Sequence, residues 1–177
     1  RYTDGTTEYL GTDSTWQTTD SPVIFNSIYT AEHYDAQKEL AGWDSPGFNA
    51  TGWYHAQETE SPTETIKSQV MHPIRETARY TATQCKKIND SCYVYHFPQN
   101  IAGVTELKVK GKKGTKLHLK HGELLDKNGM VNMANIDYHY RPTDDSDPFQ
   151  TDIVILSGKQ DRFMPKFNYK GFQFVEV

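Results

Sequence analysis

The chain has 177 residues, a net charge of −4 and a hydrophobic content of 36%, and this length fits one large domain or two small ones. Charges of both signs are interspersed, which excludes the basic patch of a nucleic-acid-binding protein. No run of about 18 apolar residues occurs, which excludes a membrane-spanning helix.

The first 57 residues contain clusters of aromatic and turn-forming residues around Trp16, Trp43 and Trp53. Residues 32–40 are the one helix-like stretch by propensity. Residues 58–72 follow. They are largely polar, begin with acidic and hydroxyl side chains broken by proline, and predict a solvated linker.

Strand patterns dominate the remainder. Residues 106–110 and 115–120 alternate apolar with basic side chains on either side of a Gly-Lys-Lys-Gly turn, which predicts a hairpin with one face in water. The polar residues 141–148 predict a loop. Residues 152–156 form a continuous apolar run, typical of a strand buried on both faces. Short strands with turns at this spacing indicate an all-β chain that forms an antiparallel β-sandwich.

The last residues, 172–177, predict another strand. Period-2 alternation places Phe172 and Phe174 on one face and Val175 and Val177 on the other. Because both faces carry apolar side chains, we expect this strand to lie in the centre of a sheet rather than at its edge.

The two cysteines, Cys85 and Cys92, flank a turn between strands predicted at 77–87 and 92–97. Paired strands could bring the thiols to the Cα separation of about 5.5 Å that a disulfide requires. Two reduced thiols are the alternative. A zinc site needs further ligands at metal-site spacing, and the sequence offers none.

Four motifs have a more specific pattern. Residues 97–103 read Phe-Pro-Gln-Asn-Ile-Ala-Gly, residues 121–126 read His-Gly-Glu-Leu-Leu-Asp, and residues 165–177 read Pro-Lys-Phe-Asn-Tyr-Lys-Gly-Phe-Gln-Phe-Val-Glu-Val. They resemble segments of the non-catalytic β-sandwich of bacterial α-L-rhamnosidases, glycoside hydrolase family 78. Residues 43–53, Trp-Asp-Ser-Pro-Gly-Phe-Asn-Ala-Thr-Gly-Trp, resemble the end of the N-terminal jelly-roll module of the same family.

The resemblance implies part of a preceding β-sandwich module at 1–57, a linker at 58–72 and a concanavalin-like β-sandwich (jelly-roll class) at 73–177. It places residues 32–40 on a strand, against their helix propensity. It also implies a piece of a longer bacterial enzyme, periplasmic or extracellular, whose catalytic carboxylates lie in a following (α/α) barrel. That parent would hydrolyse terminal α-L-rhamnosides with inversion.

In some relatives the N-terminal module binds rhamnose together with a calcium ion. This chain has Asn49 and Ala50 where the family has paired aspartates, and Thr30 and Ala31 where the family has a glycine after tyrosine. These departures weaken a ligand-binding role for this copy. We therefore expect no cofactor, with calcium in the N-terminal module as the possibility that the resemblance leaves open.

Catalytic residues are not expected in this chain. A glycosidase needs two carboxyl groups about 5–9.5 Å apart around the scissile bond, and no motif here supplies them. Glu123 could point into a cleft at the end of its strand, or it could be a surface carboxylate or a contact to another domain. Gln99 and Asn100 are further cleft or interdomain candidates, although amides at a bend often satisfy backbone groups.

Sugar-binding candidates are Asn26, Trp43 and Asp44, since an aromatic face stacks on a sugar ring and the amide and carboxylate bind its hydroxyls. Tryptophans that fill a core or a domain contact are the alternative, and we expect that of Trp16 and Trp53. The predicted partners are the catalytic barrel of the parent chain and a rhamnose-containing glycan. A self-standing carbohydrate-binding module and a purely structural spacer are the alternative functions.

Overall fold

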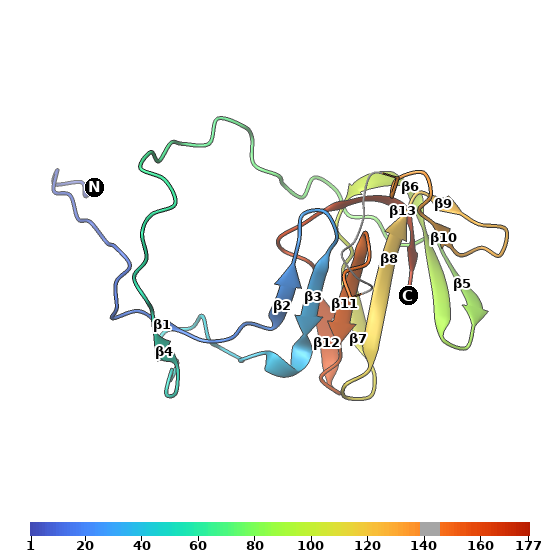
Figure 1. Ribbon diagram of the computed structural model, residues 1–177, viewed down its shortest axis with the longest axis horizontal. Helices are drawn as coiled ribbons and strands as arrows, with labels where there is room; N and C mark the ends of the chain where they lie inside the picture. The colour runs from blue at the N-terminus through green and yellow to red at the C-terminus, as the bar shows by residue number, and fades with distance from the viewer. Residues whose placement is uncertain (139–145) are drawn as a thin grey trace. The chain divides into compact units, whose positions relative to one another are not determined.

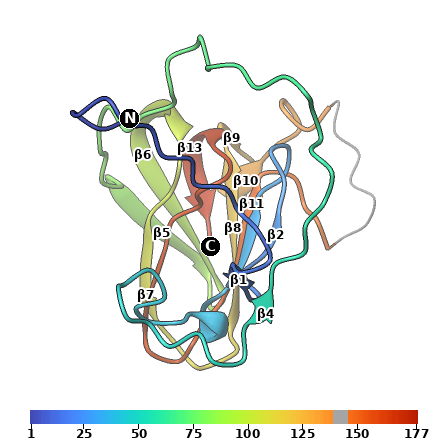
Figure 2. The same ribbon diagram turned by 90° about the vertical axis from the view of Figure 1, so that its left-hand side faces the viewer.

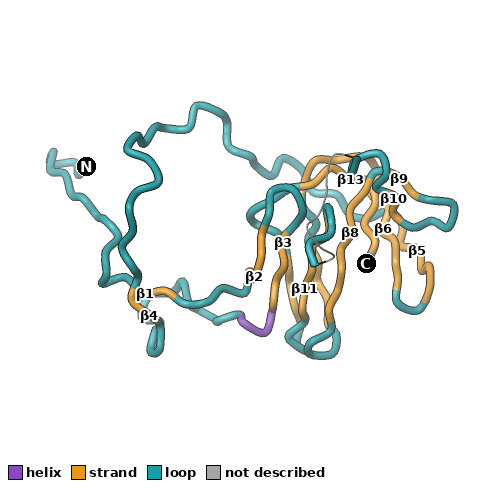
Figure 3. The backbone as a smooth tube through the Cα atoms, viewed as in Figure 1, coloured by secondary structure: helices purple, strands orange, loops and turns teal. Residues whose placement is uncertain are grey.

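A computed structural model describes residues 1–138 and 146–177, and these consist almost entirely of strands and loops (Figure 3). One short 3-10 helix, η1 (Ala36–Lys38), interrupts them. No helix in the described ranges is long and apolar enough to cross a membrane. The all-β prediction is confirmed. The strands are β1 (Gln17–Thr18), β2 (Val23–Asn26), β3 (Glu32–Asp35), β4 (Tyr54–His55), β5 (Gln84–Asn89), β6 (Cys92–Gly103), β7 (Leu107–Lys110), β8 (Lys116–Gly122), β9 (Leu124–Leu125), β10 (Val131–Asn132), β11 (Thr151–Ile155), β12 (Gln160–Phe163) and β13 (Lys170–Glu176).

The chain forms two compact units, one of residues 1–20 with 40–75 and one of residues 21–39 with 76–177. In the smaller unit β1 pairs antiparallel with β4, and the rest is loop and turn. These units do not coincide with the predicted division into 1–57, 58–72 and 73–177, because residues 21–39 join the larger unit. The predicted division of the sequence into modules at 1–57, 58–72 and 73–177 stays a prediction.

The larger unit is organised by a seven-stranded sheet with the order β2-β3-β11-β8-β13-β6-β5 (Figure 1). Every pair is antiparallel except β3 with β11, which run parallel with His33 opposite Ile153. The implied strand at the start of residues 32–40 is confirmed as β3. Within residues 32–40, helical structure forms only after β3, in the single turn η1. The Asp35 side chain caps this turn by accepting a hydrogen bond from the Gln37 backbone N–H.

A second, two-stranded sheet pairs β7 with β12, with Val109 opposite Asp161. The prediction of a hairpin over 106–110 and 115–120 is therefore wrong. The two strands exist, but β8 pairs with β11 and β13 in the large sheet, and Figure 2 shows β7 and β8 apart. Gly111 permits this connection, because a Cβ there would lie 2.6 Å from Cδ1 of Leu156.

The core lies between the large sheet and β7–β12. Its buried members come from both layers: Leu119, Val154, Leu156, Phe163, Phe172 and Val175. The apolar run at 152–156 is buried as predicted, with side chains of β11 covered on both faces of the sheet. Burying side chains of this size contributes about 1.5–3 kcal/mol each, which makes this layer contact the main source of stability for the unit.

The last strand, β13, is central as predicted, since it lies between β8 and β6. The predicted alternation of its side chains is wrong. Phe172 and Val175 both lie in the core, whereas Phe174 is only partly buried and packs edge-on against His96 at a ring distance of 5.0 Å. The pairing of β13 with β6 shifts register between Phe172 and Phe174, and such an irregularity reverses which face each following side chain takes.

Two further predictions concern local segments. Cys85 lies opposite Tyr95, Cys92 lies opposite Asn89, and both cysteines are free thiols. Because the two cysteines do not lie opposite each other in the paired strands, the alternative of two reduced thiols describes them. The predicted polar loop at 141–148 falls mainly on residues 139–145, outside the described residues.

Candidate functional site

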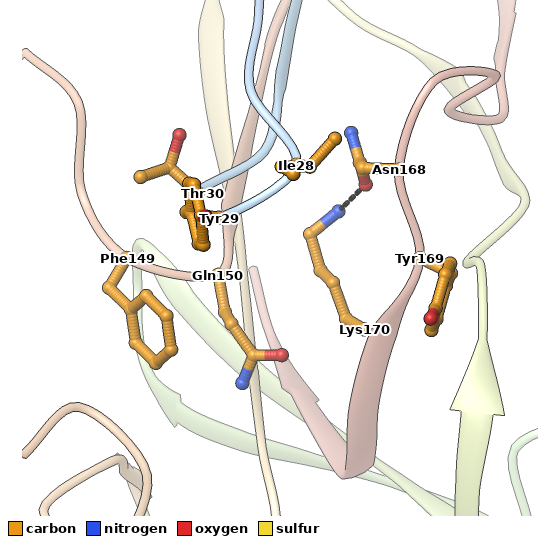
Figure 4. Close-up of a pocket in the computed structure, with 8 residues that line it drawn as sticks. All are labelled: Ile28, Tyr29, Thr30, Phe149, Gln150, Asn168, Tyr169 and Lys170. Carbon is orange, nitrogen blue, oxygen red and sulfur yellow. Dashed lines mark hydrogen bonds between the residues drawn. The ribbon is translucent and has the colours of Figure 1, made fainter. Parts of the chain in front are cut away.

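A pocket of ≈ 220 Å³ lies within the larger unit, at one end of the large sheet. Three segments that are distant in sequence form it: residues 28–30 of the β2–β3 loop, residues 149–150 before β11, and residues 168–170 at the start of β13. Figure 4 shows the first and third segments facing each other, with Lys170 between Gln150 and Asn168. The parallel pairing of β3 with β11 brings the first two segments to the same end of the sheet.

Gln150 holds an unusual backbone conformation at the pocket wall. Its φ of 47° makes it the one residue other than glycine with a positive φ in the described ranges. Its carbonyl oxygen accepts hydrogen bonds from the His121 backbone N–H (3.0 Å) and from His121 Nδ1 (3.1 Å), and its Oε1 accepts from the Gly171 N–H (3.2 Å). Such a conformation costs on the order of 1–3 kcal/mol and persists only where surrounding contacts enforce it, often at functional sites.

His121 is fully buried next to this wall, and burial lowers its pKa to about 4. Because a carbonyl oxygen only accepts, the proton of the neutral ring is assigned to Nδ1, which donates to Gln150. Nε2 then accepts from the hydroxyl of Thr105 at 2.8 Å. His121 is therefore a fixed neutral support for the Gln150 backbone.

A buried ion pair forms the floor beneath the pocket. Lys170 Nζ lies 2.7 Å from Oδ1 of Asp152, and the two side chains are 3% and 0% exposed. The same oxygen accepts from the Glu32 backbone N–H at 2.9 Å, and Lys170 also donates to Oδ1 of Asn168. Burial lowers the pKa of Lys170, and the charge of Asp152 opposes that shift.

Glu32, the first residue of β3, fixes the segment that leads to β13. Its Oε2 accepts from the backbone N–H groups of Lys166 (3.0 Å) and Phe167 (3.2 Å). Through Asp152 and these two contacts, the early hairpin is tied to two later segments that form the pocket.

Two polar atoms of the pocket lack a hydrogen-bond partner among the described residues, namely Oγ1 of Thr30 and Nδ2 of Asn168. Thr30 is 2% exposed. In Figure 4 the Asn168 amide oxygen turns toward Lys170 and its nitrogen points away. Both atoms are almost completely buried, so a ligand in the pocket would not reach them without a movement of the surrounding chain.

The predicted cleft candidates are partly brought together. Asn100 donates to Oε1 of Glu123 at 3.0 Å, and Asn135 donates to Oε2 at 3.1 Å. Gln99 instead donates to the hydroxyl of Tyr80, at 3.2 Å. Both oxygens of Glu123 are therefore held by amides. A role for Gln99, Asn100 and Glu123 at a cleft or domain contact stays a prediction.

The predicted sugar-binding residues fall in different units. Asn26 ends β2 in the larger unit, opposite Glu32, whereas Trp43 and Asp44 are exposed in a turn of the smaller unit. Their role stays a prediction. Trp53 packs against Phe48 at a ring distance of 5.6 Å. Trp16 is 47% exposed, so it fills no core among the described residues, and its expected role in a domain contact stays a prediction.

The residues of the N-terminal segment do not fit a calcium site. Oδ1 of Asn49 already accepts from the backbone N–H (3.0 Å) and the hydroxyl (2.5 Å) of Thr51, in a local turn. Across residues 1–138 and 146–177, no group of three or more His, Cys, Asp or Glu side chains is placed to hold a metal ion. Calcium prefers six to eight oxygen ligands, which this segment does not gather.

Sequence reasoning missed the pocket residues Thr30, Gln150 and Lys170. One signal was available, because Asp152 stands next to an apolar run and a carboxylate in such a place needs a buried partner. The identity of that partner depends on sheet order, which the local pattern does not give.

Comparison with known protein families matches both parts of the chain. The model of the α-L-rhamnosidase N-terminal domain matches residues 1–78, and that of the bacterial α-L-rhamnosidase concanavalin-like domain matches residues 86–177. An α-L-rhamnosidase of Streptomyces avermitilis is 31% identical, over 99% of this chain and 16% of that protein. One of Formosa agariphila is 30% identical, over 100% of this chain and 18% of that protein.

Solved structures give the same result. The crystal structure of Streptomyces avermitilis α-L-rhamnosidase complexed with L-rhamnose matches with a TM-score of 0.84 at 31% identity, over 99% of this chain and 16% of that one. The α-L-rhamnosidase from Dictyoglumus thermophilum matches with a TM-score of 0.82 at 32% identity, over 99% and 19%. The chain therefore spans less than a fifth of the length of each of these relatives.

Proposed function

Because this chain belongs to the bacterial α-L-rhamnosidase family and corresponds to the N-terminal region of its members, we propose that it is a non-catalytic β-sandwich region of a multi-domain glycoside hydrolase. In this proposal it supports a downstream catalytic (α/α) barrel in the same parent chain. The parent hydrolyses terminal α-L-rhamnosides with inversion, and a rhamnose-containing glycan is the partner of the whole enzyme.

The observation that carries this proposal is the extent of the match. The whole chain aligns with 16–18% of the length of each of two proteins named α-L-rhamnosidase. Most of the length of each relative therefore lies outside the region that matches this chain. Both family models describe domains of such enzymes by name. A supporting role next to a catalytic domain explains why these strands accompany the enzyme.

The carboxyl groups of the chain support a non-catalytic role. A glycosidase acid needs a raised pKa so that it stays protonated at its working pH. Among residues 1–138 and 146–177, the carboxyl groups whose pKa is shifted are all shifted down. Hydrogen bonds from Thr6 lower the pKa of Asp4, those from Thr15 lower that of Asp13, a bond from Arg162 lowers that of Glu106, and the Met130 backbone N–H lowers that of Asp126.

A hydrolysis assay tests the proposal. The 177-residue chain should release no aryl alcohol from an aryl α-L-rhamnoside above the buffer rate, while the parent enzyme with its barrel should turn over. A Glu123→Gln variant, which keeps a hydrogen-bonding side chain at that position, is the control. Clear turnover by the chain that disappears in Glu123→Gln would overturn the proposal.

A self-standing carbohydrate-binding module is the second candidate, and the observation that favours it is the pocket, whose lining includes the exposed tyrosines Tyr29 and Tyr169. A purely structural spacer would bind no saccharide. Titration of the chain with saccharides separates the two.

A further inference from the structure

The face of the large sheet that carries the core extends beyond the layer that covers it. Residues that lie opposite each other in paired antiparallel strands point to the same face of the sheet. Tyr95 of β6 lies opposite Val175 of β13, and Val175 is a member of the core. Tyr95 therefore belongs to the core face, yet it is 36% exposed. The covering strands β7 and β12 leave this part of the core face open to solvent.

The open part continues along β6 and onto β5, the two strands at the end of the sheet that is opposite to β2 (Figure 1). Tyr93 lies two residues before Tyr95, so it points to the same face, and it is 38% exposed. On β5, Cys85 lies opposite Tyr95 and is an exposed free thiol. We call Tyr93, Tyr95 and Cys85 the tyrosine face.

The opposite face of β6 is covered. Cys92 and Val94, which alternate with the two tyrosines, are 9% and 0% exposed. On this side Val131 of β10 donates its backbone N–H to the carboxylate of Glu176 at 2.8 Å, and Glu176 lies opposite Val94. Large side chains with apolar surface on both faces are typical of a strand that is buried between two layers. Because only one face of β6 is buried here, the tyrosine face has the composition of a surface that another layer covers.

Val177 lies directly beside the tyrosine face. Its backbone N–H donates to the carbonyl oxygen of Tyr93, and its own carbonyl oxygen accepts from the Tyr93 N–H, each at 2.8 Å. In the proposed parent enzyme, the residues that follow 177 therefore start next to this face. The region that matches this chain makes up 16–19% of the length of its relatives, so a large part of such an enzyme is available to cover the face.

We propose that the tyrosine face is a docking surface for the part of the parent chain that follows residue 177, a proposal that rests on the proposed role of this region in a multi-domain enzyme. The occupant carries apolar side chains that continue the core over Tyr93 and Tyr95. It also carries oxygen atoms that accept hydrogen bonds from the two tyrosine hydroxyls. Tyrosine is enriched where protein surfaces meet, because its ring is apolar and its hydroxyl binds polar partners.

The thiol of Cys85 is a probe of the tyrosine face. Its rate of labelling by a maleimide, measured by mass spectrometry of the Cys85 peptide, is compared between the 177-residue chain and the folded parent enzyme. Labelling in the parent should be slower by about tenfold or more, because the docked surface must open before the thiol reacts. The matched control is Lys127→Cys in the exposed turn between β9 and β10, which should react equally fast in both proteins. Equal rates for Cys85 in the two proteins would overturn the proposal.

The double variant Tyr93→Glu with Tyr95→Glu tests whether the tyrosines hold the docked part. Two carboxylates on the face should expel an apolar partner, so Cys85 of the parent should label as fast as in the 177-residue chain. The urea midpoint of the 177-residue chain should change little, because both side chains are exposed there. Tyr54→Glu, at an exposed tyrosine of the smaller unit, is the control and should leave Cys85 protected. Protection that survives in a folded double variant would contradict the proposal, and the comparison of the unmodified proteins needs no variant.

Other occupants of the face give different results. Labelling of Cys85 that slows as the concentration of the 177-residue chain rises would assign the face to a second copy of this chain and overturn the proposal. Equal labelling in chain and parent, with a chain that is inert toward the aryl α-L-rhamnoside, would remove the docking surface and leave the supporting role intact. A chain that hydrolyses the rhamnoside would remove the supporting role itself.

Discussion

The ammonium nitrogen of Lys170 lies 2.7 Å from the carboxylate of Asp152, and both side chains are almost completely buried. Lys170 stands at the start of β13 and Asp152 lies in β11, with β8 between the two strands. The pair therefore spans three strands of the large sheet and forms the floor of the pocket. Because both groups are buried, removing either one would leave the charge of the other unpaired inside the protein.

Lys170→Met should destabilise the chain by about 3–5 kcal/mol, because it leaves the Asp152 charge buried without its partner. Urea melts followed by circular dichroism measure the change. Adding Asp152→Leu should recover most of the loss, since paired removal of a buried ion pair is often neutral. Lys87→Met, which breaks the exposed pair with Asp90, is the control and should cost at most about 1 kcal/mol. A loss of that small size for Lys170→Met would mean that the buried pair is not a structural element.

His121 should make folding sensitive to mild acid. Its folded pKa of about 4 lies below the ordinary value of about 6.5. Between those values the unfolded chain binds a proton that the folded chain does not, so this contribution is complete above about pH 6.5 and is lost as the pH falls. The loss should reach on the order of 3 kcal/mol near pH 4.

Urea melts at several pH values check this, with His121→Gln as the comparison. The variant has no titrating ring, so its stability should change less between pH 6.5 and 4.5 than that of the unmodified chain. Parallel pH profiles for the two proteins would refute the assignment of His121 as a buried neutral group.

Phe172→Ala should cost about 3–5 kcal/mol, the usual loss for a fully buried phenylalanine. Phe172 is 1% exposed and packs edge-on against Phe97 and His121. Phe174→Ala should cost clearly less, because the register shift turns Phe174 out of the core. Denaturant melts of the two variants give the comparison, and equal losses would mean that the two rings share one environment.

The β2–β3 hairpin should be essential for the sheet that follows it. Deleting residues 1–39 removes the parallel neighbour of β11 and the Glu32 carboxylate that binds the Lys166 and Phe167 N–H groups. This deletion should abolish the cooperative transition, seen by circular dichroism. Deleting residues 1–20 is the control and should preserve it, because β2 and β3 remain. A peptide of residues 21–39 should restore structure to the longer deletion. A cooperative melt of that deletion alone would show that the hairpin is dispensable.

The sequence predicted strands more reliably than their partners. The apolar run at 152–156 and the apolar last strand identified β11 and β13, because burial on both faces leaves a direct mark on composition. The hairpin at 106–120 failed because alternation shows that two strands exist but not that they pair. The irregularity between Phe172 and Phe174 has no signal in the local sequence, and it reverses the facing of the residues after it.

The pocket could not be predicted from local sequence patterns, because these patterns do not give the order of the strands in the sheet. Residues 28–30, 149–150 and 168–170 meet only through sheet order, and Gln150 adopts its positive φ because His121 and Gly171 hold it there. By contrast, Asn100 and Glu123 were each predicted as a candidate for a cleft or a domain contact, and their side chains form a hydrogen bond.

The parallel pairing of β3 with β11 has a consequence for synthesis. Glu32 and Asp152, which bond across this contact, are 120 residues apart. A ribosome that adds about 5–20 residues each second needs about 6–24 s to cover that distance. During this interval the β2–β3 hairpin has been synthesised but β11 has not, so the backbone edge of β3 that later pairs with β11 is exposed. An exposed strand edge can pair with another nascent chain. Slow translation between residues 40 and 150 would lengthen the time for which β3 is exposed. The yield of folded protein should therefore depend on chaperones that bind β3 until β11 has been synthesised.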